Sequence, residues 1–266
     1  MKIRFQRKFL AIPYLLFFLF FLVLPIFLIV YYAFTDHNGK FTFDLVRNFF
    51  SDTGKLEVLA ISLIFGLLNT IFCLLIGYPV SMLLANKKYN KNAVLVTLFI
   101  MPMWINFVIR TWATRDLLAW IGLSGGIYPE LATTIGLVYN YLPFAIMPLY
   151  TTMLKMDQSQ IEAASDLGAN PVQVFFKVII PMTKPGILSA ATMVFMPTIS
   201  SYVIADILGE GKVTLFGKYI QIYFGQSDWN NGSLLALIML LLISISFILN
   251  KKTAQSDEGG VKSSIW

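Results

Sequence analysis

The chain of 266 residues contains one cysteine, Cys73, and one histidine, His37. A disulfide needs two cysteines, and a zinc site built from cysteine and histidine needs several such residues, so neither can form within this chain. Cys73 lies inside an apolar run, whereas His37 lies between two such runs. A cysteine–histidine nucleophile pair is therefore not expected, and neither is a metal site.

The sequence also lacks the signatures of nucleotide binding and of catalysis in the membrane. It has no Gly-x-x-x-x-Gly-Lys-Ser/Thr run, and Gly-Glu-Gly-Lys at 209–212 does not have that spacing. The apolar runs contain no pair of carboxylates, and a membrane enzyme needs a cluster of reactive groups. We therefore predict neither a catalytic role nor a cofactor bound by this chain.

Charged residues are scarce, at 13% of the chain, whereas 57% of the residues are hydrophobic and 23 are phenylalanine. This balance is typical of a membrane protein, and a run of about 20 apolar residues can cross a bilayer as a helix. The first run is too long for a signal peptide and is followed by no clean cleavage site, so it is expected to be retained. The sequence predicts a single all-α membrane domain, 1–266, with six transmembrane helices. The predicted spans are 9–34, 58–85, 94–113, 131–154, 185–205 and 234–249, and residues 35–56 are expected to form a polar loop between the first two.

The basic residues predict the orientation of these spans. With the N-terminus inside, 13 of the 20 Lys and Arg residues, but only 5 of the 14 Asp and Glu residues, lie on the cytoplasmic side. Cytoplasmic segments of membrane proteins carry such an excess of Lys and Arg. Both termini are therefore expected in the cytoplasm, together with the segment 155–184 between the fourth and fifth spans.

Segment 155–184 has the pattern of two short helices separated by a sharp break. Asp157 is a good N-cap, and Gln160 three residues later completes a capping-box pattern. Gly168 is expected to end the first helix in the left-handed conformation that glycine adopts at little cost. The small side chains of Ala163 and Ala164, together with Gly168, leave a low surface that another protein can approach closely.

The second short helix is expected to begin at Asn170 and Pro171. Asn170 can cap the helix, Pro171 fits its first position, and Gln173 again lies three residues after the cap. Pro181 is expected to stop this helix, because proline lacks the backbone N–H of a helix interior.

Polar residues inside the spans are candidates for function, because burying them in a membrane is costly. In the fifth span Thr198, Tyr202 and Asp206 are spaced i, i+4 and i+8, which predicts a stripe on one helix face. A carboxylate beside aromatic rings suits an organic cation. For Asp206, a role in the substrate pathway and a role in a loop both remain open.

The third and fourth spans carry further candidates. In the third span, the spacing predicts one face with Trp104 and Trp112 and another with Asn106 and Arg110. The fourth span carries Tyr139, Asn140 and Tyr141. Tryptophan and tyrosine near span ends also form the ordinary interfacial belt of membrane proteins, so both interpretations of the aromatic residues stay open.

The run Glu162-Ala163-Ala164, followed by Gly168 and by Val-Ile-Ile-Pro at 178–181, resembles the EAA loop of ABC importer permeases. The resemblance implies the type I (MetI-like) permease fold. It also implies that segment 155–184 is a coupling helix that docks on an ATP-binding subunit. The residues that the resemblance assigns to this docking are Glu162, Ala163, Ala164, Gly168 and Pro181.

Residues 102–112, 136–150 and 197–209 resemble the third, fourth and fifth spans of the spermidine/putrescine permeases. The resemblance implies a permease subunit that moves polyamines across a bacterial plasma membrane. Arg110 would then pair with an acidic partner, whereas Glu210 interrupts glycines that are usually adjacent in these relatives. The substrate pathway would include Trp104, Asn106, Trp112, Tyr139, Tyr202 and Asp206.

The same resemblance implies the partners. These are a dimer of ATP-binding subunits that hold the ATP, a second permease subunit and an extracytoplasmic substrate-binding protein, with lipid around the spans and no nucleic acid. Related permeases carry other organic cations, metal chelates or thiamine, so the substrate remains open among these. A self-contained channel or secondary transporter is a further alternative, but it would not need segment 155–184.

Overall fold

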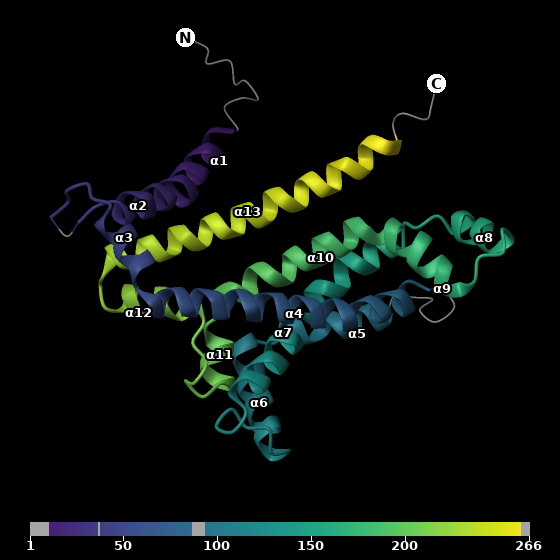
Figure 1. Ribbon diagram of the computed structural model, residues 1–266, viewed down its shortest axis with the longest axis horizontal. Coiled ribbons are helices and arrows are strands. Elements are labelled where there is room, and N and C mark those ends of the chain that lie inside the picture. The colour runs from purple at the N-terminus through teal and green to yellow at the C-terminus, as the bar shows by residue number, and fades with distance from the viewer. Residues whose placement is uncertain (1–10, 37, 87–93, 262–266) are drawn as a thin grey trace, which may run out of the picture. The chain divides into compact units, whose positions relative to one another are not determined.

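The computed structural model describes residues 11–36, 38–86 and 94–261. His37, the basic residues of 1–10 and 87–93, and the tail after 261 lie outside the described residues. Within the described ranges the chain is helical, and the only strand-like pairing there is an isolated bridge between Thr35 and Phe41 (Figure 1). The all-α prediction is confirmed. The helices are α1 (Ala11–Phe18), η2 (Leu19–Val23), α2 (Leu24–Ala33), α3 (Asp44–Ser51), α4 (Thr53–Ala85), α5 (Val94–Ile100), η3 (Met101–Trp104), α6 (Phe107–Trp120), α7 (Pro129–Met153), α8 (Gln158–Asp166), α9 (Pro171–Val174), η4 (Phe175–Ile179), α10 (Ile180–Ser200), α11 (Val203–Leu208), α12 (Phe216–Gly225) and α13 (Trp229–Val261).

Five helices of the described chain are long and apolar enough to cross a membrane, and a sixth span results if one bent helix pair is counted as a span. This agrees with the six predicted spans. The continuous ones are Pro13–Ala33, Thr53–Ala85, Pro129–Met153, Pro171–Ser200 and Trp229–Ile248, and the bent pair is Val94–Trp104 with Phe107–Trp120.

The described chain divides into two compact units. Unit 1 comprises Met1–Glu57 and Tyr219–Leu242, and unit 2 comprises Val58–Lys218 and Ile243–Trp266. In unit 1 the side chain of Asn230 is buried, and its Nδ2 donates to the carbonyl oxygens of Tyr32 at 3.1 Å and Thr35 at 2.6 Å. These hydrogen bonds link the end of the first span to the start of the last.

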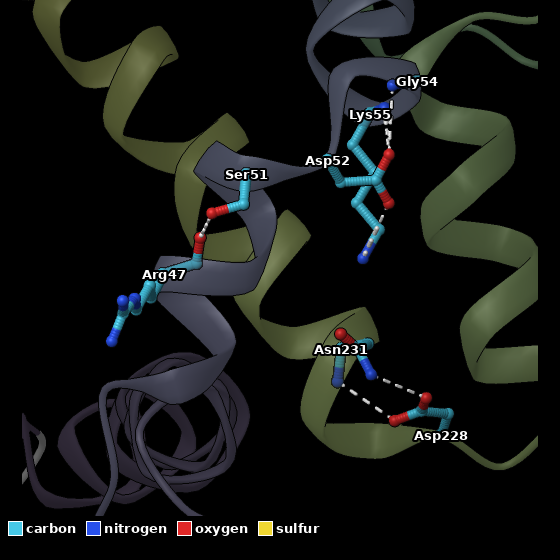
Figure 2. A network of polar contacts seen from close by, with 7 residues as sticks. All are labelled: Arg47, Ser51, Asp52, Gly54, Lys55, Asp228 and Asn231. Atoms are coloured by element: carbon cyan, nitrogen blue, oxygen red, sulfur yellow. Dashed lines mark hydrogen bonds and ion pairs between the residues drawn. The ribbon is translucent and has the colours of Figure 1, made fainter.

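The start of α4 corrects the prediction that residues 35–56 form a loop. The Asp52 carboxylate accepts from the backbone N–H groups of Gly54 at 3.0 Å and Lys55 at 3.3 Å, and it pairs with Lys55 Nζ at 3.7 Å (Figure 2). A carboxylate in this position satisfies the free N–H groups of a first helical turn. The second span therefore begins at Thr53, five residues before the predicted start, and α3 occupies part of the predicted loop.

The core of unit 2 lies where α4, α7 and α10 pack together. α7 and α10 run side by side, and α11 packs against α6 and α7 (Figure 1). A buried hydrogen bond of 2.7 Å from Asn69 Nδ2 to Thr198 Oγ1 links α4 to α10. Around it lies one apolar cluster, whose members are Cys73, Ala145, Leu149, Ala190 and Val194. Cys73 is thus a small core residue, as its place in an apolar run indicates.

The third span is broken, which corrects the prediction of one helix over 94–113. α5 and η3 meet α6 at an angle of 95°. The Asn106 side chain accepts from the N–H of Val108 at 2.8 Å and so starts α6 as an N-cap. Trp104 and Trp112 therefore lie on different helices, and the common face predicted for them does not exist.

The fifth span also differs from its prediction at both ends. The helix runs through Pro181 without stopping, because a π turn, η4, precedes it. Such local adjustments satisfy the backbone around a proline in a membrane helix. α10 ends at Ser200, and α11 begins again at Val203. The predicted single-helix stripe of Thr198, Tyr202 and Asp206 is therefore wrong.

Candidate functional site

The first candidate site is the surface of α8 and α9. Asp157 is the N-cap of α8, and its Oδ1 accepts from Ser159 N–H at 3.0 Å and from Ser159 Oγ at 2.7 Å. The cap is confirmed, but its side-chain bonds run to Ser159, whereas the prediction involved a capping box with Gln160. The Ser159 hydroxyl and then its backbone N–H hold the pKa of Asp157 below its ordinary value.

The break between the two short helices is confirmed. Gly168 has a φ of +84°, and the N–H of Ala169 donates to the carbonyl of Ala164 at 3.1 Å. Asn170 and Gln173 form a complete capping box, with bonds of 2.8 and 3.0 Å between each side chain and the other residue's backbone N–H. These local bonds fix the shape of the segment without help from distant residues.

The surface of this segment is open. Glu162, Ala163 and Gly168 are exposed, and Leu167 beside them is 88% exposed. The sequence prediction missed Leu167, although a large apolar residue between Asp166 and Gly168 could have been noticed. A shallow groove of about 310 Å³ follows this surface, and its lining is Ala164, Leu167, Gly168, Ala169, Gln173, Lys177 and Val178.

The cap at Asp157 gives a pH-dependent prediction. Because the folded pKa of this carboxyl is lowered, its contribution to the stability of α8 is present above the ordinary pKa, about 4, and is lost as the pH falls through the folded pKa. Asp157→Ala is expected to speed amide hydrogen exchange across α8 severalfold at neutral pH and to remove the acid-dependent step. Mass spectrometry of peptides from 157–168 measures this exchange.

Asp157→Asn is the matched control, because asparagine caps helices as well as aspartate but does not titrate. It should keep slow exchange at neutral pH and lose only the acid step. Equal exchange in the wild type and in Asp157→Ala would show that the cap does not hold α8.

The second candidate site is a cavity in unit 2 at the break in the third span. Its volume is about 460 Å³, and it brings together Trp104 and Asn106, two of the predicted pathway residues. Trp104 is 81% exposed at its rim. The lining is Met103, Trp104, Ile105, Asn106, Phe107, Arg110, Asn140, Tyr141, Phe144 and Ile204. Asn140 and Tyr141 are polar candidates of the fourth span that the sequence did not assign to the substrate pathway, and both line this cavity.

Arg110 lies in the wall of this cavity, and its surroundings differ from the prediction. Its Nη2 donates to Asn140 Oδ1 at 3.0 Å, and its guanidinium lies 5.6 Å from the centre of the Tyr139 ring. None of the ion pairs within the described chain includes Arg110. The predicted acidic partner is thus not supplied by the described residues of this chain.

The other predicted pathway residues lie apart from this cavity. Trp112 stacks with the Arg115 guanidinium at 5.1 Å, and Tyr202 is partly exposed between α10 and α11. Asp206 Oδ2 pairs with Lys218 Nζ at 2.9 Å near the surface. Of the predicted pathway residues, only Trp104 and Asn106 line this cavity. The Tyr139 ring contacts the Arg110 guanidinium.

The fold matches solved transporters. One is a bacterial alginate ABC transporter in complex with a periplasmic protein bound to an alginate pentasaccharide; it aligns with a TM-score of 0.72 over 94% of this chain and 93% of its own, at 13% identity. A bacterial ABC transporter involved in the import of the acidic polysaccharide alginate aligns with a TM-score of 0.66 over 92% and 94%, at 17% identity. At these identities the likeness concerns the fold, which is that of the type I, MetI-like, ABC importer permeases.

The sequence comparisons give the family. Residues 3–253 match the family described as binding-protein-dependent transport system inner membrane component, and the chain belongs to that family. It is 34% identical over 258 residues to the spermidine/putrescine transport system permease protein PotB of Haemophilus influenzae, covering 88% of this chain and 90% of the relative. It is also 34% identical over 219 residues to PotB of Escherichia coli K12, covering 74% and 80%. The chain is a multi-pass plasma-membrane protein and the permease subunit of an ABC importer.

Proposed function

We propose that this importer carries polyamines of the spermidine and putrescine type. The observation that carries the proposal is the 34% identity, over most of both chains, to permeases named for spermidine and putrescine transport. The similarity spans the membrane helices as well as the EAA loop, so it includes the part of the chain that meets substrate.

The chemistry of the exposed side chains supports an ammonium-bearing substrate. Trp112 and Tyr202 are exposed aromatic side chains outside the cavity at Arg110, and aromatic rings attract ammonium groups by about 0.5–2 kcal/mol each. Asp206 already pairs with one primary ammonium, that of Lys218. Substrate ammonium groups would exchange with Lys218 at this carboxylate, since both carry the same charged group.

We assign the coupling to ATP hydrolysis to α8 and α9. We place both termini and segment 155–184 in the cytoplasm, supported by the excess of Lys and Arg in the segments on that side. The ATP-binding subunits would dock on the groove beside Gly168, with Glu162 contacting a basic residue and Leu167 filling an apolar pocket. Their closure would rock the spans of this chain and of a second permease subunit, while a substrate-binding protein delivers substrate from the other side.

Uptake of labelled spermidine tests the substrate. Cells or vesicles with the chain should show ATP-dependent uptake that is lost when the chain is deleted and restored when it is supplied again. Unlabelled putrescine should compete, whereas thiamine and ferric chelates should not. If deletion leaves spermidine uptake unchanged, while the chain purified from wild-type cells is bound to an ATP-binding subunit, the chain belongs to an importer whose substrate is not a polyamine.

A further inference from the structure

The side chain of Arg110 is left with unmet hydrogen-bonding capacity. It is only 8% exposed, and of its guanidinium nitrogens Nη2 is bonded to Asn140. Nε and Nη1 have no hydrogen-bond partner among the described residues. A buried cation whose N–H groups lack acceptors is costly, and buried charges in proteins are normally paired. The arrangement therefore needs acceptors from outside the described chain.

Two cavities give access to Arg110. The first is the cavity of about 460 Å³ rimmed by Trp104. The second has a volume of about 420 Å³, and its other lining residues are Leu98, Phe99, Pro102, Tyr139, Leu142 and Pro143. An acceptor can thus reach the guanidinium from either side of the break in the third span.

Lipid does not suit the surface around the first cavity. Ile105 and Asn106 form the non-helical break between η3 and α6, and both are exposed. Lipid chains cannot satisfy backbone groups outside a helix, so breaks of this kind occur where protein or an aqueous cavity covers them. The rim carries the large apolar side chains of Trp104, Ile105 and Phe107, which favour protein as the cover.

The positive charge of Arg110 determines which chemical group can lie against it. A polyamine carries the same sign of charge as the guanidinium and is repelled by it. A carboxylate attracts it and accepts its N–H groups. Tryptophan, tyrosine and arginine are also enriched at the energetically dominant positions of protein interfaces, and Trp104 and Tyr141 line the cavity with Arg110.

We propose that the cavity at Arg110 is an interface with the second permease subunit, which inserts a carboxylate side chain that pairs with this guanidinium. The inference rests on the proposed function, because it takes the importer to contain a second permease subunit. Arg110 then fixes the broken third span against that subunit, and substrate passes on another side of α6.

Retention of the second permease subunit tests the interface. The importer is purified in detergent through a tag on this chain, and the second subunit is quantified by mass spectrometry. Arg110→Met is expected to lower its retention at least about thirtyfold, because truncating one partner of a buried charge pair is costly. Arg115→Met is the matched control on the same helix: Arg115 is half-exposed and pairs with Glu210, so its removal should leave retention unchanged.

Arg110→Lys locates the carboxylate. Carbodiimide joins the introduced amine to a contacting carboxylate as an amide, and peptide mapping then identifies the joined residue. A cross-link to a membrane-spanning peptide of the second permease subunit is the expected result. A cross-link only within this chain, or full retention in Arg110→Met, would overturn the interface.

The fold of the variants is checked separately by their amounts in the membrane and by thermal unfolding of the tagged chain alone. Suppose that the wild type takes up spermidine and that the wild type and Arg110→Met retain the second permease subunit equally well. Then only the proposed interface at Arg110 is wrong. If the wild-type chain does not co-purify with a second permease subunit, or does not support spermidine uptake, the proposed function itself is wrong.

Discussion

Gly168→Asp is expected to separate the importer from its ATP-binding subunit and to lower uptake by at least about tenfold, the equivalent of 1.4 kcal/mol. Gly168 has a φ of +84°, where residues with a Cβ are disfavoured by about 1–2 kcal/mol. No atom lies within 4 Å of a Cβ built there, so the groove that Gly168 lines has room for the added carboxylate. A charge on a closely docking surface loses its solvation, and the larger side chain also holds the two surfaces apart. Co-purification of the ATP-binding subunit, together with spermidine uptake, measures the effect.

Gly211→Asp separates docking from backbone strain. Gly211 has a φ of +76° and equally open surroundings, but it lies in the loop after α11 and not in α8 or α9. This variant carries a similar backbone cost and should keep the ATP-binding subunit. Equal loss in both variants would assign the effect to strain, and no loss in Gly168→Asp would show that the groove is not where the subunit docks.

The caps and the turn of segment 155–184 were predicted well because they are local. The caps at Asp157 and Asn170 and the turn at Gly168 depend on residues no more than five positions apart. Such bonds can be recognised in a sequence without knowing the fold. Pro181 was misjudged, because the π turn that accommodates it has no comparable sequence pattern.

The break in the third span was missed although it has a local cause. Asn106 followed by Phe107 is an N-cap pattern, and Pro102 stands shortly before it. The pattern lies within an apolar run, and the length of that run favoured a single span. Apolar composition predicts that a segment enters the membrane, but it does not predict whether the segment crosses as one helix.

The surroundings of the polar residues could not be predicted, because their partners are distant in the chain. Arg110 meets Asn140 across 30 residues, and Asn69 meets Thr198 across 129. Both bonds depend on how α4, α6, α7 and α10 pack. The sequence therefore identified Trp104 and Asn106 as candidates without showing that a buried arginine faces the same cavity.

Gly217→Ala is expected to destabilise the packing of α12 against the end of α10. A Cβ on Gly217 would overlap the backbone carbonyl of Ser200, the last residue of α10, and would come within 2.9 Å of its carbon. Backbone cannot rotate away as a side chain can, so the two helices must separate. Overpacking of this kind costs about 3 kcal/mol, which lowers the Tm by about 6–12 °C for a chain of this size.

Gly225→Ala, at the other end of α12, is the matched control for that prediction. No atom lies within 4 Å of a Cβ built on Gly225, and alanine is the better helix former by about 1 kcal/mol. Thermal unfolding of the purified chain in detergent should therefore show a large fall in Tm for Gly217→Ala and an unchanged or slightly raised Tm for Gly225→Ala. Because Lys218 follows Gly217 directly, the first variant should also disturb its ion pair with Asp206 and change spermidine uptake. An unchanged Tm in Gly217→Ala would show that α12 and the end of α10 do not approach each other this closely in the membrane.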